Sequence, residues 1–274
     1  MRVFDLGPRH GPMLAFGGPY SNLHALRAMR GLARAENFDK KSVICTGDVV
    51  AYGSQPRECV AEMRKWGITC VAGNCELQLA AGADSCGCGF TAGSLCDALS
   101  AGWYGYANDT LTEVERTWMA ACPDLVVFTM GGRRYVVLHG GASAVAEFLW
   151  HDSPVSAFAQ EVAMLEDVLG GPIDAVIAGH SGVPFRRRVA GVDWINAGVI
   201  GMPAHDGTAA TRFAVIHPTG DVDQRELLYD AQAAHDHMVA KGLTQGYHTA
   251  LLSGWWPSED VLPHSLRRIQ GVAE

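Results

Sequence analysis

Val43-Ile44-Cys45-Thr46-Gly47-Asp48 opens the stretch that decides the fold, and Ile68-Thr69-Cys70-Val71-Ala72-Gly73-Asn74-Cys75-Glu76 closes it. Each segment begins with an apolar run that is too short for a helix, which predicts a buried strand. Each run ends at a glycine followed by a side chain with a metal-binding oxygen, Asp48 or Asn74. The segment from Pro56 to Trp66 is predicted to be the helical crossover that parallel strands require. Because ligands sit beyond the carboxyl ends of such strands, we expect Asp48 and Asn74 side by side at one rim of a sheet.

Two later runs end in the same way. Arg134 to Leu138 is followed by His139, and Ile173 to Ala178 is followed by Gly179 and His180. The four polar side chains would then meet at one rim. One carboxylate, one amide and two imidazoles form a ligand set suited to Zn, Mn or Fe. The sequence therefore predicts a site for a divalent transition metal.

Composition places the chain among ordinary globular proteins. Its 274 residues are 48% hydrophobic and 18% charged, with a net charge of −8, which is enough chain to bury a full core. The densest basic run, Arg186-Arg187-Arg188, is typical of a solvated loop, so we predict no nucleic-acid partner. No apolar run approaches the ~20 residues of a membrane span, and residues 1–8 lack a secretory apolar region. We predict a cytoplasmic protein that does not enter the membrane.

The rest of the chain alternates strands with helices early and pairs strands later. This order predicts an α/β fold with two mixed sheets and helices outside, in a domain of residues 1–230 and a helical and loop tail, 231–274, packed on it. Beyond those above, strands are expected at 12–16, 125–130, 185–189, 192–197, 212–217 and 224–229. Helices are expected at 23–36, 77–81, 112–121, 155–169 and 230–241. Residues 1–11 are interpreted as a polar leader and the part after Gly242 as loop-rich.

All eight cysteines lie between Cys45 and Cys122. Without an export signal, we expect no disulfide framework among them. Cys86 and Cys88 lie in a small-residue loop, 82–93, with Cys96 just beyond. Two interpretations remain open for these three: a soft metal or redox site, or a Gly-rich loop with incidental thiols.

The order of these motifs resembles the calcineurin-like metallophosphoesterase family, in its compact bacterial branch. The matching segments are Gly47-Asp48-Val49-Val50-Ala51-Tyr52-Gly53, Gly73-Asn74-Cys75-Glu76, Leu138-His139-Gly140, Gly179-His180-Ser181-Gly182 and the segment from Asn196 to Pro203. The resemblance covers Pro12 to Tyr229. It implies an αββα sandwich and the hydrolysis of small phosphomonoesters or diesters with two metal ions.

The departures from the family pattern fall on one side of that dinuclear site. The resemblance implies that Asp48, Asn74, His139 and His180 form one complete metal site. For the other ion, Gly18 replaces an Asp, Tyr20 a His and Gly182 a second His. We therefore expect one ion per chain. The alternative is a degenerate member that uses these residues only for packing.

Several residues are further candidates for contact with substrate or for proton transfer. Cys75 stands where the family has a His that acts as a general acid; a thiol can donate a proton, attack once ionised, or bind metal. Cys75, Asp48 and His139 are thus the catalytic candidates, with Cys75, Cys86, Cys88 and Cys96 as possible additional metal or thiol ligands. Tyr20, Asn22 and His205 are candidate substrate contacts; for Tyr20 the alternative is that its ring fills the vacated ligand position. Trp255 and Trp256 are interpreted as a tail anchor, with a pocket lid as the alternative.

The resulting prediction is a metal-dependent hydrolase, a phosphoesterase with a single-metal site acting on a small phosphate ester. One alternative is a metal- or ligand-binding protein that kept the scaffold without turnover. The other is Fe or Zn chemistry assisted by the cysteines.

Overall fold

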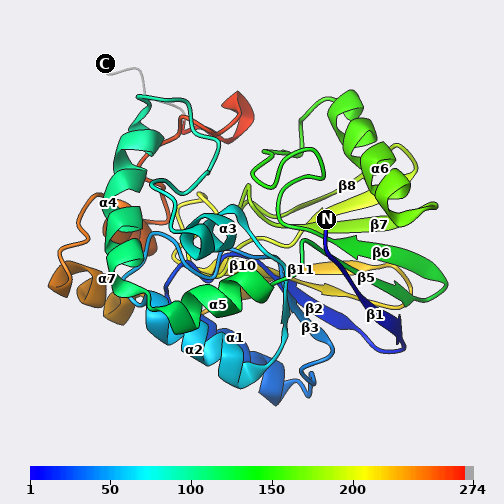
Figure 1. The fold of residues 1–274 in the computed structure, drawn as a ribbon, viewed down its shortest axis with the longest axis horizontal. Helices are drawn as coiled ribbons and strands as arrows, with labels where there is room; N and C mark the ends of the chain where they lie inside the picture. Colours follow the sequence, from blue (N-terminus) through cyan, green and yellow to red (C-terminus); the bar gives the residue numbers. More distant parts are fainter. Residues whose placement is uncertain (269–274) are drawn as a thin grey trace.

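The computed structural model describes residues 1–268 and confirms two mixed sheets packed face to face with helices outside (Figure 1). The first sheet has the order β11-β10-β2-β3-β4 and the second β1-β5-β6-β7-β9-β8. Their bounds are β2 (Met13–Phe16), β3 (Val43–Cys45), β4 (Thr69–Cys70), β10 (Thr211–Ile216) and β11 (Val222–Leu227) in the first. In the second they are β1 (Val3–Arg9), β5 (Leu125–Met130), β6 (Arg133–Val137), β7 (Ala175–Ala178), β8 (Phe185–Val189) and β9 (Val192–Asn196).

The parallel part of the first sheet places the two deciding motifs at one rim. Strands β2, β3 and β4 run parallel, and Cys45 pairs with Cys70 in the register. The connections are α1 (Leu23–Ala35) and α2 (Pro56–Trp66), the crossovers that parallel strands need. Because β3 and β4 end together, the chain after each strand enters the same edge. The expected neighbourhood of Asp48 and Asn74 is confirmed.

The second sheet brings two histidines to the same rim. Strand β6 runs parallel to β7, with Val137 paired to Ile177, so His139 and His180 follow neighbouring strand ends. The predicted hairpin between β5 and β6 is confirmed. Its turn requires a glycine at position 131: Gly131 has φ +58°, and a Cβ added there would lie 1.8 Å from the carbonyl oxygen of Pro218. Helix α6 (Val155–Leu169) covers the outer face of this sheet (Figure 1).

Side chains alternate between two buried layers, as the period of a strand requires. In β2, Leu14 and Phe16 face the helices, whereas Met13 and Ala15 face the other sheet. The layer between the sheets also contains Ile44, Val126, Val137, Ile177, Ile195, Ala214 and Ile216. This apolar contact fixes one sheet against the other, and with it the distance between the two pairs of rim residues.

The remaining helices surround the rim. They are α3 (Asn74–Ala81), α4 (Leu95–Thr110), α5 (Glu113–Ala121), α7 (Ala231–Ala240), α8 (Tyr247–Ser253) and the 3-10 turn η1 (His264–Leu266). Within residues 1–268, no helix is long and apolar enough to cross a membrane. The division at residue 230 stays a prediction; α7 packs on α1 and on α8.

One expectation about the ends of the chain was wrong. The polar leader contains β1, which pairs in parallel with β5 and whose first residues are exposed. An edge strand with little buried surface has no hydrophobic alternation to reveal it. The described part after Gly242 is mostly loop, as expected, and also contains α8, a seven-residue helix between Gly246 and Gly254, both with positive φ. A helix this short is below the length at which periodicity is informative.

Candidate metal centre

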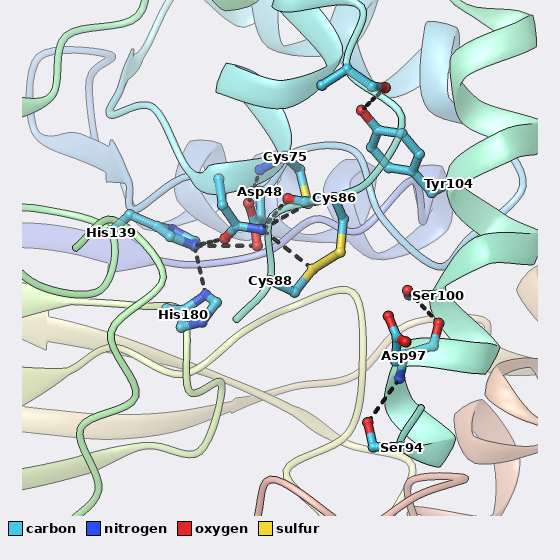
Figure 2. The surroundings of a disulfide bond; sticks show 12 residues. Asp48, Cys75, Cys86, Cys88, Ser94, Asp97, Ser100, Tyr104, His139 and His180 are labelled. Atoms are coloured by element: carbon cyan, nitrogen blue, oxygen red, sulfur yellow. Dashed lines mark hydrogen bonds and ion pairs between the residues drawn. A yellow bond between two sulfur atoms is a disulfide. The ribbon is translucent and has the colours of Figure 1, made fainter. Parts of the chain in front are cut away.

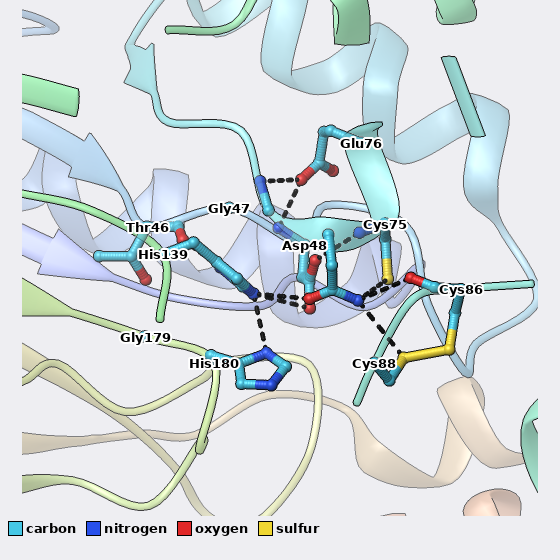
Figure 3. A network of polar contacts seen from close by, with 12 residues as sticks. Thr46, Gly47, Asp48, Cys75, Glu76, Cys86, Cys88, His139, Gly179 and His180 are labelled. Carbon is cyan, nitrogen blue, oxygen red and sulfur yellow. Dashed lines mark hydrogen bonds and ion pairs between the residues drawn. A yellow bond between two sulfur atoms is a disulfide. The ribbon is translucent and has the colours of Figure 1, made fainter. Parts of the chain in front are cut away.

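Four side chains from four strand ends converge at the rim (Figure 3). The Nε2 atom of His139 lies 3.0 Å from Nδ1 of His180, 3.1 Å from Oδ1 of Asn74 and 3.2 Å from Oδ2 of Asp48. All four residues are buried. The structure thus brings together the residues that the sequence predicted as a group.

The donor atoms of this group fit a cation. Nδ1 of His139 lies 2.6 Å from the carbonyl oxygen of Thr46, so the proton on that nitrogen is donated there and Nε2 keeps its lone pair. Oδ1 of Asn74, Oδ2 of Asp48 and Nδ1 of His180 then face this fourth acceptor. Ligating atoms of Asp48, His139 and His180 lie within 4.8 Å of one another. A divalent ion would satisfy all four atoms at once, with the N and O ligands that Zn and Mn accept.

Two glycines allow this convergence. A Cβ on Gly47 would lie 2.7 Å from the backbone nitrogen of Gly73 and 2.8 Å from Nδ1 of His139. A Cβ on Gly73 would lie 2.2 Å from Oδ1 of Asp48. Any other residue at either position would push the strand ends apart. Asp48 and His180 themselves have φ of 55° and 38°, conformations that non-glycine residues adopt at a cost of order 1–3 kcal/mol and that cluster at functional sites.

Glu76 holds the two strand ends together. No role was expected for this residue, although the sequence motif contains it. Its carboxylate accepts the Asp48 N–H at 2.7 Å (Figure 3), and it also accepts those of Gly73 at 2.9 Å and Val49 at 2.8 Å. Burial and the Asp48 carboxylate raise the pKa of Glu76 to about 7, against these three N–H groups. The available signal was its place three residues after Gly73, at the start of α3, which is the position of the acid in a capping box.

The charges at the centre suit metal ligation. Burial alone would lower the pKa of His139, but the Asp48 carboxylate raises it above its ordinary value; a cation at Nε2 therefore takes the place of a proton there. Burial and His139 lower the pKa of His180 to about 3, so that imidazole stays neutral. Burial would raise the pKa of Asp48, but His139 lowers it, so the carboxylate is ionised. An ionised carboxylate beside a neutral imidazole is the state in which both bind a cation.

The Cys75 thiol lies buried beside the centre. Its Sγ is 3.6 Å from Nδ2 of Asn74, and its backbone N–H donates to Oδ1 of Asp48 at 3.2 Å. Burial, with Asp48 and Glu76 nearby, raises the pKa of the thiol well above its ordinary value. A pocket opens beside Asp48 and His180, and Cys75 is not among the described residues that line it. Its assignment as a general acid or ligand stays a prediction.

Cys86 and Cys88 form a disulfide, so the expectation of no disulfide was wrong for this pair (Figure 2). Gly87, with φ +61°, turns the chain between them and leaves their Cα atoms 5.3 Å apart, within the range that a disulfide spans. In this state the two sulfurs are not thiolate ligands. The bridged loop instead holds Asn74, whose Nδ2 donates to the Cys86 carbonyl at 2.9 Å and lies 3.4 Å from Sγ of Cys88. These contacts turn the other amide atom, Oδ1, toward His139.

A pocket with a free volume of about 50 Å³ opens beside Asp48 and His180. Aromatic side chains form most of its wall: Tyr20, Tyr52, Phe90, Phe148, Tyr247 and Trp256. Two of these rings lie beside Gly18 and Gly182. A Cβ on Gly18 would lie 2.4 Å from the Tyr20 ring, and a Cβ on Gly182 would be in contact with Trp256 at 3.6 Å. The Tyr20 ring thus fills part of the vacated space.

The other candidate residues lie outside this group of four. Asn22 caps α1 through the Ala25 N–H, donates to the Gly201 carbonyl and borders a second, smaller cavity. His205 fastens the tail, because its Nδ1 accepts the Trp256 N–H at 2.9 Å and its Nε2 lies 3.0 Å from Glu259. Cys96 is a free thiol in the pocket wall. Of the three predicted substrate contacts, Tyr20 is the one in the wall of the pocket beside Asp48 and His180.

Comparisons with known proteins concern the family and the fold. A sequence model described as the calcineurin-like phosphoesterase superfamily domain matches residues 18–221. A hypothetical protein of Pyrococcus horikoshii OT3 has a similar structure, with 16% identity, a TM-score of 0.69, and 90% of this chain and 99% of that chain covered. A metallophosphoesterase from Sphaerobacter thermophilus gives 20% identity, a TM-score of 0.67, and coverage of 90% and 100%. No curated protein matches the chain. At these identities the structural likeness concerns the fold.

Proposed function

Because the chain belongs to the calcineurin-like phosphoesterase superfamily, we propose that it is a metal-dependent phosphoesterase with one divalent ion per chain. Asp48, Asn74, His139 and His180 hold that ion. The observation that carries the proposal is the approach of three donor atoms to within 3.2 Å of Nε2 of His139. Zn, Mn and Fe all accept this set of ligands.

The residues around the ion have separate tasks. A divalent ion at this place polarises a phosphoryl oxygen and lowers the pKa of a bound water. Asp48 supplies the negative charge of the ligand set, and Thr46 fixes the tautomer of His139. Burial raises the pKa of Tyr20 well above its ordinary value, so its hydroxyl stays protonated and available to a substrate in the pocket. Cys75 remains the candidate proton donor.

The limit of one ion rests on the side of the centre where family ligands are absent. Gly18 and Gly182 have no side chain that could supply a ligand atom, and the rings of Tyr20 and Trp256 lie next to them. Two ions normally clamp both the attacking and the leaving oxygen of a phosphoryl transfer. With one ion, we expect slower hydrolysis of simple phosphate esters than two-ion relatives achieve.

The test is metal content per chain by elemental analysis, on protein purified without chelators, for the natural protein and for Asp48→Ala and His139→Ala. One equivalent that both variants lose, together with loss of ester hydrolysis, is the expected result. Hydrolysis that persists in Asp48→Ala after the metal has gone would refute the proposal. Two equivalents in the natural protein would refute the limit of one ion.

A second candidate function is a metal- or ligand-binding protein without turnover. The aromatic filling at Gly18 and Gly182 favours it, because that side of the centre has lost the ligands of one ion. It predicts one bound equivalent with no hydrolysis of any phosphate ester at any metal loading. Steady-state assays over Zn, Mn and Fe therefore separate the two functions.

A further inference from the structure

The pocket beside the metal centre has an unusual charge for a site that receives phosphate esters. Among the described residues of its wall there is no Lys or Arg; the ionisable groups are Asp48, His180, three Tyr and the thiol of Cys96, because Cys88 is bridged to Cys86. Burial raises the pKa of Tyr20 and Tyr52, so those hydroxyls are neutral. The wall therefore contributes one negative charge and no positive charge.

From this charge and from the rings we infer the substrate class: a phosphodiester monoanion with at least one aromatic substituent. The inference rests on the proposed function, because it assumes one divalent ion. That ion and Asp48 sum to one positive charge, which a diester balances. A monoester carries close to two negative charges at neutral pH, since its second pKa is about 6. An unbalanced charge in a buried site is costly.

Neither Glu76 nor the start of α3 supplies the missing positive charge. Glu76, buried behind Asp48, is an acid. The N-terminus of α3 carries the partial positive charge of a helix end, but Asp48 already accepts the Cys75 N–H and Glu76 the Gly73 N–H. The nearby backbone donors are therefore already used within the protein.

The rings offer a surface for planar groups. The Phe148 ring lies 4.3 Å from the ring of His180, which places it beside a metal ligand, and 6.4 Å from the Phe90 ring. On the other wall, Tyr52 lies 4.8 Å from Tyr20 and 4.4 Å from Tyr247. Aromatic pairs at such spacing gain about 0.5–1.5 kcal/mol beyond the area that they bury. An aromatic substituent next to the phosphorus would contact Phe148 first.

The free volume of about 50 Å³ has room for a few water-sized groups. An aromatic substituent therefore has to separate the walls. The tail supplies one of them, through Trp256, Pro257, Ser258 and Val261. Its polar contacts run from His205 to Glu259 and from the Leu95 N–H to Asp260 at 2.8 Å, and Trp256 also packs on the apolar cluster under the helices. None of these contacts belongs to the layer between the sheets, so we expect the wall to move outward without opening that layer.

The test is calorimetric binding of three stable probes to the metal-loaded protein: diphenyl phosphate, dimethyl phosphate and phenyl phosphate. The first two carry one charge with and without rings, and the third has one ring and close to two charges. We expect diphenyl phosphate to bind at least about 10-fold more tightly than either of the others, since 1.4 kcal/mol corresponds to tenfold. Equal or tighter binding of phenyl phosphate would overturn the inference.

A pair of matched variants assigns the effect to the wall. Phe148→Ala should weaken diphenyl phosphate about 3- to 10-fold and leave dimethyl phosphate unchanged. Phe4→Ala, on the exposed edge of β1, is the control and should change neither. An unchanged affinity of Phe148→Ala for diphenyl phosphate would overturn the role of the rings. Tight diphenyl phosphate binding without hydrolysis of any ester refutes the proposed function and keeps the inference; preferred hydrolysis of monoesters refutes the inference alone.

Discussion

Two halves of one rim differ in the side chains that they present. The retained half, as we call it, consists of Asp48, Asn74, His139 and His180, where donor atoms of the other three lie within 3.2 Å of Nε2 of His139. The replaced half, by our proposal of one ion, consists of the positions of Gly18, Tyr20 and Gly182, where the rings of Tyr20 and Trp256 lie. The proposal implies that a fold can keep its backbone while packing takes the place of half of its ligands.

The largest effect is expected from the retained half. His180→Ala should weaken metal affinity by more than about 100-fold, since changes even to residues that only support ligands cost about 10- to 100-fold. The measurement is competition with a chromogenic chelator. His151→Ala, an exposed loop histidine, is the matched control. Unchanged affinity of His180→Ala would break the comparison, because the retained half would then not be a metal site.

The next effect concerns the support of Asn74. Cys86→Ser with Cys88→Ser removes the bridge that holds its amide and should weaken metal affinity about 10- to 100-fold, by the same chelator competition. Thiol titration of the denatured natural protein, without reductant, should find the six free cysteines of the structure. Eight thiols would contradict the bridge, and a double variant with full affinity would contradict its role in positioning Asn74.

Rebuilding the replaced half tests the comparison from the other side. Gly18→Asp, Tyr20→His and Gly182→His together remove the Tyr20 ring and return three ligands, so a second metal equivalent is expected by elemental analysis. Gly18→Asp alone is the control: its Cβ meets the Tyr20 ring at 2.4 Å, so it should bind no extra metal and lose about 1–3 kcal/mol of stability from overpacking. A second equivalent in that single variant would show that the ring does not fill the space.

The smallest effect separates stability from metal binding. Asp193, far from the rim, pairs with Arg133 at 2.6 Å and Arg186 at 3.3 Å. Burial would raise the pKa of Asp193, but these guanidinium groups lower it. Its stabilisation is therefore present above the unfolded pKa of about 3.9 and is lost as pH falls through the lower folded pKa. Asp193→Asn should lose about 1 kcal/mol at neutral pH, measured by denaturant unfolding, with unchanged metal content. The difference from the natural protein should shrink toward pH 2; a constant difference would contradict the ionic origin.

The convergence of the four candidate ligands and the sheets that carry them were predictable for one physical reason. Asp48 and His180 each follow a glycine at the end of a buried apolar run, and parallel strands bring such ends to one edge. Local pattern and global topology agree there. The helices α2 and α6 have the predicted bounds because their apolar periodicity extends over at least 11 residues.

What the sequence did not reveal depends on contacts between distant segments. Trp256 packs against Gly182 across 74 residues, and no periodicity encodes that contact. Glu76 was visible in its motif, but its bonds to Asp48 and Val49 follow from the tertiary approach of two strand ends. The bond between Cys86 and Cys88 depends on the turn at Gly87. The expectation about disulfides rested instead on the redox conditions of the compartment, which say nothing about a local turn.

The position of the tail wall has a consequence for the order in which the site is made. The four ligands of the retained half are complete at His180, while Tyr247, the first tail residue of the pocket, comes 67 residues later in the sequence. At a synthesis rate of about 5–20 residues per second, about 3 to 13 seconds separate them. During that interval the ligands emerge from the ribosome without the wall that later narrows their approach. A newly made chain meets metal ions through a wider opening than a refolded, finished chain does.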